Sequence, residues 1–217
     1  MTAAKSLKGS KTKSIIIKSA KLLFKEKGFA KTSVLDICNA AGVKAGTFTY
    51  HFNTKDDLVR AIYAEVFGKC YEFVDSKLDR ELNSVEKNTF VAFLYFHALL
   101  NDPQTSAFHH EILIKGSVRN FVYPIVFPLF EHYNHDLNLN LLEKELTDID
   151  LAVHGISREI VTDYLENPGK RSIIDIVNTI YIFRARIFTI DENLMKVYLF
   201  NGMEFERNYD HTHIRLL

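Results

Sequence analysis

The sequence predicts an all-α protein with a small N-terminal three-helix domain and a larger C-terminal helical domain. Apolar residues recur mostly at intervals of three and four, as on one face of a helix, and few segments alternate with the period of two typical of strands. Only four prolines and nine glycines interrupt the 217 residues.

The charged residues are divided unevenly along the sequence. Residues 1–60 hold 12 Lys/Arg and 4 Asp/Glu, a net of +8, whereas residues 61–217 hold 15 and 23, a net of −8. A basic module attached to an acidic body is typical of a chain that binds a polyanion.

Composition argues against several classes of protein. No run of about 18 apolar residues is present, so we expect no membrane span, and the basic N-terminus lacks the apolar stretch of a secretory signal. Cys38 and Cys70 fall at apolar helix positions and are too few for a disulfide framework, so we expect buried, reduced thiols and a cytoplasmic protein. No glycine-rich phosphate loop, nucleophile elbow or paired-carboxylate pattern occurs, so we predict neither enzymatic activity nor a cofactor.

The first domain is predicted to begin after a basic flexible arm over residues 1–11, which is rich in Ala, Lys and Ser. A helix over residues 12–27 follows. Gly28 is placed to end it, because glycine readily adopts the left-handed conformation of such an end, and Phe29 would then pack back on Phe24.

Two shorter helices come next. The second begins after Ser33, which has the capping-box spacing to Asp36, and ends at Gly42. Its inward stripe is Val34, Ile37, Cys38 and Ala41. The third, at residues 44–51, has about two turns and is too short to be stable alone, so its neighbours must hold it. The side chains expected to turn inward for this purpose are Ala45, Phe48 and Phe52.

A long fourth helix is predicted after Thr54, with Asp57 as its capping-box acid. Six further helices are predicted, at about 85–100, 103–115, 118–138, 147–166, 172–190 and 192–208. Pro124 and Pro128 are expected to kink the helix at 118–138. We place the domain boundary at residue 60, which gives domains of 12–60 and 61–217.

The outward face of the short third helix is polar and partly aromatic. It carries Lys44, Thr47, Tyr50 and His51. A helix of this kind fits the major groove of duplex DNA. Lys44 and Lys55 also stand at helix N-termini, where a cation is unfavourable unless an anion such as a phosphate is bound. The alternatives are a packing role for Tyr50 and a purely structural role for His51.

One signature extends over about residues 12–62. It consists of Lys31-Thr32-Ser33-Val34, Asp36-Ile37, Ala40-Ala41-Gly42-Val43, Gly46-Thr47-Phe48, Tyr50-His51-Phe52 and Thr54-Lys55-Asp56-Asp57-Leu58. Together these segments resemble the N-terminal DNA-binding signature of TetR-family regulators. The resemblance implies a homodimer that binds a pseudo-palindromic duplex operator, with residues 44–52 as the recognition helix.

The resemblance also implies contacts between particular side chains and DNA. The predicted DNA-binding residues are Thr32, Ser33, Lys44, Thr47, Thr49, Tyr50, His51 and Lys55. Of these, Thr47 and Tyr50 would touch bases or phosphates, and Lys55 would hold a phosphate. The sequence departs from the family pattern at Thr49, where many relatives have tyrosine, and at Lys44, where a small hydroxyl residue is frequent.

The helix at 172–190 is apolar nearly all round, so it has two surfaces to bury. The resemblance implies that two late helices of each subunit form a four-helix dimer interface; the alternative is a deeply buried helix of a monomer. The predicted interface residues are Ile173, Val177, Ile180, Tyr181, Phe188, Val197 and Phe200.

The central helices are rich in phenylalanine, and the resemblance implies a small-molecule pocket among them. We therefore predict a repressor released by a small, largely apolar effector, although core packing explains each phenylalanine equally well. The candidate effector-binding residues are Phe93, Phe96, Phe108, Phe121, Phe127 and Phe130. The alternative is an effector-independent regulator or a protein-binding adaptor with the same fold.

No metal site is predicted. His109 and His110 are adjacent in a helix and point about 100° apart. His132 and His135 can share a helix face, but two ligands do not make a site. The last histidines, His211 and His213, are expected to lie in a frayed tail.

Overall fold

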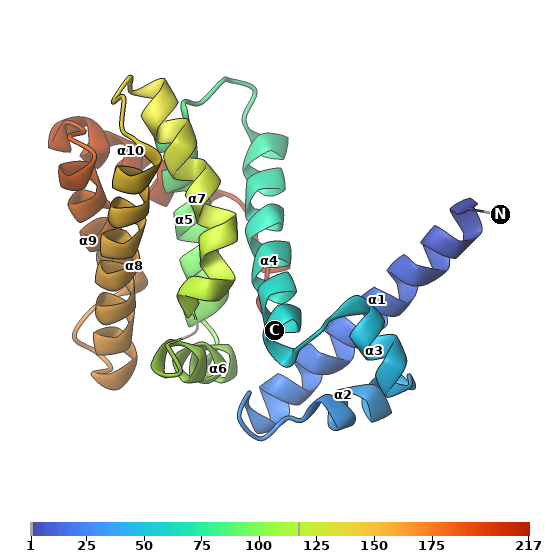
Figure 1. Cartoon of the computed structure of the whole chain (residues 1–217). Coiled ribbons are helices and arrows are strands. Elements are labelled where there is room, and N and C mark those ends of the chain that lie inside the picture. The colour runs from blue at the N-terminus through green and yellow to red at the C-terminus, as the bar shows by residue number, and fades with distance from the viewer. Residues whose placement is uncertain (1, 117) are drawn as a thin grey trace.

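The structure is a computed structural model that describes residues 2–116 and 118–217, and this part of the chain forms ten helices and no strand (Figure 1). The predicted all-α class is therefore confirmed. The first helices are α1 (Thr2–Lys27), α2 (Val34–Ala41), α3 (Ala45–His51) and α4 (Lys55–Lys77). In Figure 1, α1 to α3 form a small group at one end of the molecule, and α4 runs from that group along the body.

The body is a bundle of six further helices. They are α5 (Ser84–Leu100), α6 (Pro103–Ile114), α7 (Val118–Asp136), α8 (Glu143–Glu166), α9 (Ile173–Ile187) and α10 (Glu192–Asn208). The central helix is α5, which packs against α4, α6, α7, α9 and α10, and most of its side chains are buried. The short α6 lies across the end of the bundle nearest α1, with which it is in contact (Figure 1).

Local capping explains why most predicted helix starts are correct. The hydroxyl of Ser33 accepts from the Asp36 N–H, and that of Thr54 accepts from the Asp57 N–H, as predicted. Each such cap contributes about 0.5–2 kcal/mol. Gly28 ends α1 with a φ of +79°. The Phe29 ring then lies 5.8 Å from that of Phe24, centroid to centroid, which confirms the predicted packing.

Two predicted boundaries differ most from the structure. The predicted flexible arm is helical from Thr2, because its alanines and lysines favour a helix that α1 can extend. α8 begins at Glu143, four residues before the predicted start, and the Glu145 carboxylate accepts from the Leu142 N–H at 2.8 Å. α7 is one helix that includes Pro124 and Pro128, as predicted, and a kink at these prolines stays a prediction.

A single hydrophobic core joins the two parts of the chain. Cys38 and Cys70 are both buried and unpaired, as predicted. The C-terminal segment after α10 is not a frayed tail, because His211, Ile214 and Leu216 are buried against the bundle. In the described part of the chain, no helix is both long and apolar enough to cross a membrane. Residue 60 lies within α4, so the domain boundary placed there remains a proposal.

Candidate functional site

The α2–turn–α3 unit presents a short helix to solvent. Gly42 makes the turn, with φ and ψ of 64° and 33°, in the left-handed region that favours glycine. The Val43 N–H donates to the Cys38 carbonyl at 3.0 Å and fixes the exit of α2. Lys44 is then the N-cap of α3 and makes no side-chain cap hydrogen bond. The turn therefore sets the direction of α3 and leaves the Lys44 side chain exposed.

The underside of α3 is aromatic. Phe48 and Phe52 are buried, and their ring centroids are 5.8 Å apart. Ala45, which was predicted to turn inward, is exposed instead, because two large rings suffice to fill the space beneath a seven-residue helix. The predicted propping of α3 by Phe48 and Phe52 is thus observed.

The opposite side of α3 is open to solvent. Tyr50 is 80% exposed, so it does not have the packing role that was its alternative. His51 is half-buried and meets the Tyr50 ring edge-on at 4.9 Å. Thr49 is exposed although its hydroxyl donates to the Ala45 carbonyl, and Thr47 is partly exposed. These residues, with Lys44, form one polar and aromatic face, which we call the reading face.

Two predicted DNA contacts at the start of α2 have intramolecular partners. Thr32 is only 1% exposed, and its hydroxyl donates to the Gly28 carbonyl at 2.7 Å. The prediction that it contacts the DNA backbone is therefore corrected: its side chain holds the α1–α2 connection. Ser33 is exposed, but its hydroxyl donates to Asp36 at 2.7 Å in the capping box.

Lys55 also has a different environment from the one predicted. Its ammonium donates to the carbonyls of Phe29 and Thr32, both at 2.7 Å, and lies 3.9 Å from the centroid of the Phe29 ring. Burial, with the nearby Lys115, lowers the pKa of Lys55. Lys55 therefore ties the start of α4 to the α1–α2 connection, and a phosphate would have to compete with two carbonyl groups for it.

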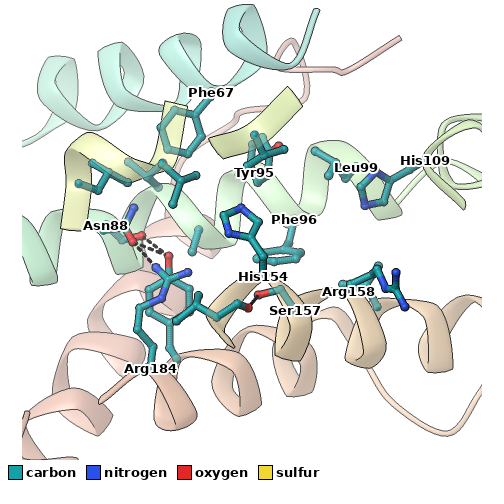
Figure 2. A pocket seen from close by; sticks show the side chains of 18 of the residues that line it. Phe67, Asn88, Tyr95, Phe96, Leu99, His109, His154, Ser157, Arg158 and Arg184 are labelled. Carbon is teal, nitrogen blue, oxygen red and sulfur yellow. Dashed lines mark hydrogen bonds between the residues drawn. The ribbon is translucent and has the colours of Figure 1, made fainter. Parts of the chain in front are cut away.

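A cavity of about 100 Å³ lies inside the body, between α4, α5, α6, α7, α8 and α9 (Figure 2). Most of its wall is apolar, for example Val91, Leu99 and Val126. Figure 2 shows Asn88 and Arg184 at one end, with Tyr95, Phe96 and His154 between that end and His109. The cavity thus combines an apolar wall with a few polar groups, which is typical of ligand sites.

The polar end of the cavity holds a buried cation. The Arg184 guanidinium donates to the Asn88 side-chain oxygen at 2.7 Å and lies 4.3 Å from the centroid of the Tyr181 ring. The same Asn88 oxygen accepts from the hydroxyls of Tyr181 and Tyr133. Arg184 Nε has no hydrogen-bond partner. Within the described residues, no carboxylate forms an ion pair with Arg184, so its charge has no internal counter-charge.

At the other end, His109 is buried and uncharged. Burial lowers its pKa to about 3. The Tyr63 hydroxyl lies 2.6 Å from His109 Nδ1. Burial raises the pKa of Tyr63 well above its ordinary value, so the hydroxyl keeps its proton and donates to the imidazole.

Most of the predicted effector-binding residues do not line the cavity. Among the described residues that line the cavity, Phe96 is the one predicted phenylalanine. Phe93 packs against Gly202 of α10, Phe108 stacks on Phe24 at 5.0 Å, and Phe130 packs on Phe188 at 5.3 Å. The other two that do not line the cavity are Phe121 and Phe127. These rings fill helix–helix contacts, where large apolar area stabilises packing most.

The sequence interpretation missed the polar groups of the cavity. One signal was available: Arg184 falls on the same helix face as the apolar Val177, Ile180 and Tyr181, at intervals of seven, four and three residues. A charge on such a face is rarely buried without a specific partner. Asn88 and His154 gave no comparable signal, because polar residues are ordinary on the helices that carry them.

One helix, α6, touches both the cavity and the N-terminal group. His109 and Leu113 line the cavity. On other sides of α6, the Glu111 carboxylate accepts from the Ala30 N–H at 2.8 Å, and the Lys115 ammonium donates to Asp56 at 2.7 Å. The position of α6 therefore bears on both the cavity and the α1–α2 connection.

The predicted dimer-interface residues divide into two groups. Val177, Ile180, Tyr181 and Phe188 are buried within the chain, and Ile173 is half-buried. For the four buried residues the prediction of a partner contact is corrected, because this side of α9 packs within the same chain, where α9 contacts α5, α8 and α10. For Ile173 it stays a prediction. Val197 and Phe200 on α10 are 53% and 60% exposed. With the exposed Leu194 of the same helix, they form what we call the α10 apolar face.

Comparison with known proteins finds DNA-binding regulators that are similar to this chain. Residues 16–62 match the family model described as bacterial regulatory proteins, tetR family. The repressor KstR2 of Rhodococcus jostii is 41% identical over 64 residues, which are 28% of this chain and 31% of KstR2. The chain therefore spans about a third of that relative's length. The fatty acid metabolism regulator protein of Bacillus subtilis is 23% identical over 175 residues, 76% of this chain and 89% of that protein.

A solved structure of RolR in complex with resorcinol has the same fold, with a TM-score of 0.59 and 18% identity, over 94% of this chain and 97% of RolR. The family match covers the α2–turn–α3 unit, and the fold match covers the body as well. Residues 16–62 therefore form a DNA-binding domain of the TetR family of transcriptional regulators, as the sequence predicted, and the whole chain shares the fold of RolR.

Proposed function

We propose that this chain is a homodimeric repressor that binds a pseudo-palindromic duplex operator through α3 and is released by a small-molecule effector bound in the cavity. The observation that carries the proposal is the reading face. Phe48 and Phe52 hold α3 from beneath, so that Lys44 and Tyr50 project into solvent. A short helix held in this way can enter the major groove.

The operator proposal is tested by selecting bound duplexes from a random pool and then measuring affinity against salt concentration. Lys44→Ala should weaken binding to every duplex and reduce the salt slope by about one, because one phosphate contact is lost. Tyr50→Ala should change sequence preference as well as affinity. Lys170→Ala, a change of an exposed lysine in the α8–α9 connection, is the matched control. Unchanged DNA binding in both Lys44→Ala and Tyr50→Ala would refute the assignment of α3.

The cavity supports an effector that is apolar over most of its surface and carries one anionic group. A buried charge without a counter-charge costs several kcal/mol. An anion beside Arg184 would offset that cost and supply a partner for its Nε. This refines the small, largely apolar effector expected from the sequence, because that expectation did not include Arg184. The volume of about 100 Å³ favours a compact molecule.

The effector proposal is tested with pairs of compact aromatic or aliphatic carboxylic acids and their primary amides. Thermal denaturation of the full chain should show stabilisation by an acid but not by its amide. Arg184→Met, which keeps most of the side-chain volume, should remove this discrimination, and Arg184→Lys should retain part of it. Equal stabilisation by acid and amide would contradict the anionic assignment while leaving the operator proposal intact.

A further inference from the structure

Three potential metal ligands meet at the C-terminal end of α10, away from the reading face and the cavity. They are His97 on α5, Glu206 on α10 and His211 in the segment that follows α10. Glu206 Oε1 lies 3.0 Å from His97 Nδ1 and 3.2 Å from His211 Nε2. The ligand atoms of the three side chains all lie within 4.8 Å of one another.

The side chain of His211 uses only one of its two ring nitrogens in a hydrogen bond. Its side chain is only 8% exposed, and its Nδ1 lies 3.0 Å from the Tyr209 carbonyl, to which it donates. In the neutral imidazole the other nitrogen, Nε2, then carries a lone pair. That nitrogen is buried, has no hydrogen-bond partner and faces the Glu206 carboxylate. Two acceptors this close together repel each other unless a cation, either a proton or a metal ion, lies between them.

The donor set matches one class of cation. Two imidazole nitrogens and one carboxylate oxygen are a common set of three protein ligands for Zn²⁺, which leaves the fourth position for water. With metal–ligand bonds of about 2.0–2.1 Å, tetrahedral ligand atoms lie roughly 3.3 Å apart. The two separations at Glu206 need to open by only a few tenths of an ångström to reach this value. The bond from His211 Nδ1 to a backbone carbonyl is also the usual second contact that orients a metal-binding histidine.

A hollow of about 190 Å³ reaches one of the three residues, His97, and its wall also includes Asn101, Thr212 and Arg215. It gives water access to His97 and so allows both entry of an ion and a fourth ligand. The opposite wall of the hollow includes Lys25 of α1, which forms an ion pair with Asp102 at 3.3 Å. The site therefore lies beside a contact between the N-terminal group and the body.

We propose that His97, Glu206 and His211 form a binding site for a divalent transition-metal ion of the Zn²⁺ class, which fastens the C-terminal segment to α5 and α10. Ion binding would add metal–ligand bonds between three parts of the chain that packing and hydrogen bonds such as that from Thr89 to the Tyr198 carbonyl already hold together. The proposal depends on neither DNA binding nor an effector.

The test is calorimetric titration of Zn²⁺ into the full-length, untagged protein at neutral pH, with the Co²⁺ absorption spectrum as a second readout. We expect one ion per chain and a Co²⁺ spectrum typical of tetrahedral coordination. His211→Asn keeps a donor for the Tyr209 carbonyl but removes the metal ligand, so affinity should fall by about tenfold or more, as should that of Glu206→Gln. His213→Asn, which changes an exposed histidine two residues away, is the matched control and should bind like the unaltered chain.

Two results would overturn the proposal. One is no stoichiometric binding of Zn²⁺ or Co²⁺ to the unaltered chain, which would mean that the cation between His211 and Glu206 is a proton. The other is equal affinity in the unaltered chain and in His211→Asn, which would place the ion elsewhere. Far-ultraviolet circular dichroism without metal establishes that the variants are folded. Operator binding, measured separately, distinguishes failure of this site from failure of the proposed repressor function.

Discussion

At the scale of single residues, the ionisation of His109 links acidity to folding stability. Its pKa in the folded chain is about 3 because the ring is buried, whereas an unfolded chain gives histidine a pKa of about 6.5. Between these values the unfolded state binds more protons, so stability falls as the pH drops. The loss from this residue should be on the order of 2 kcal/mol between pH 7 and pH 5.

The prediction is checked by urea unfolding at pH 7 and pH 5 for the unaltered chain and for His109→Gln. Glutamine does not titrate in this range, and its side-chain oxygen can accept from the Tyr63 hydroxyl. The variant should therefore lose clearly less stability between the two pH values. Equal losses in both proteins would show that other groups control the acid response.

Residue-scale comparison also shows what sequence reasoning could reach in the DNA-binding region. Phe48, Phe52 and Tyr50 were assigned correctly to the inner and outer sides of α3, because a two-turn helix with a single buried side leaves few choices. Thr32 and Lys55 were not, because their partners are carbonyl groups of the α1–α2 connection. Backbone acceptors in a connecting segment have no signature in the sequence.

At the scale of elements, α6 is placed to transmit a signal from the proposed effector site to the N-terminal group. A ligand that displaced His109 would move the helix that also carries Glu111 and Lys115. Glu111 lies against the end of α1, and a Cβ at Gly28 would collide with its carboxylate. This close fit means that a displacement of α6 must be accommodated by the α1–α2 connection.

We predict that Glu111→Gln weakens the response to effector more than it weakens operator binding. The amide oxygen of the glutamine can still accept from the Ala30 N–H. A hydrogen bond to this neutral oxygen has roughly half the strength of one to a carboxylate. The measurement is operator affinity with and without a stabilising acid. The factor by which the acid weakens operator binding should fall severalfold. Operator affinity without the acid should stay within about threefold of that of the unaltered chain. Glu159→Gln, on the exposed side of α8, is the control. An unchanged factor in Glu111→Gln would show that the signal does not pass through this contact.

Helix boundaries were predictable because they depend on local chemistry. Capping residues such as Ser33, Thr54 and Asp102 satisfy N–H groups only two or three positions away. The cavity was not predictable in the same way. Whether a phenylalanine lines it depends on partners far along the chain, as when Phe108 stacks on Phe24. An apolar side chain has the same periodicity whether it faces a neighbour or an empty space.

At the scale of the whole molecule, the division of charge matches the division of tasks. The acidic body carries a net of −8 and the basic N-terminal part +8. The body would be repelled by a DNA backbone, which favours approach by the N-terminal end. Two such ends on one particle would bind two half-sites about one helical turn apart.

Dimerisation should depend on the α10 apolar face, where Phe200 and Val197 are more than half exposed. Exposed apolar side chains gathered on one face are typical of an interface between proteins. Phe200→Glu would place a carboxylate in the buried centre of that interface, so sedimentation should show a monomer where the unaltered chain is a dimer. Leu151→Glu, at an equally exposed apolar residue on α8, should stay dimeric.

Because each monomer has one reading face, Phe200→Glu should also bind a full operator no more tightly than a half-site. A Phe200→Glu dimer with full operator affinity would place the interface on another face of the bundle.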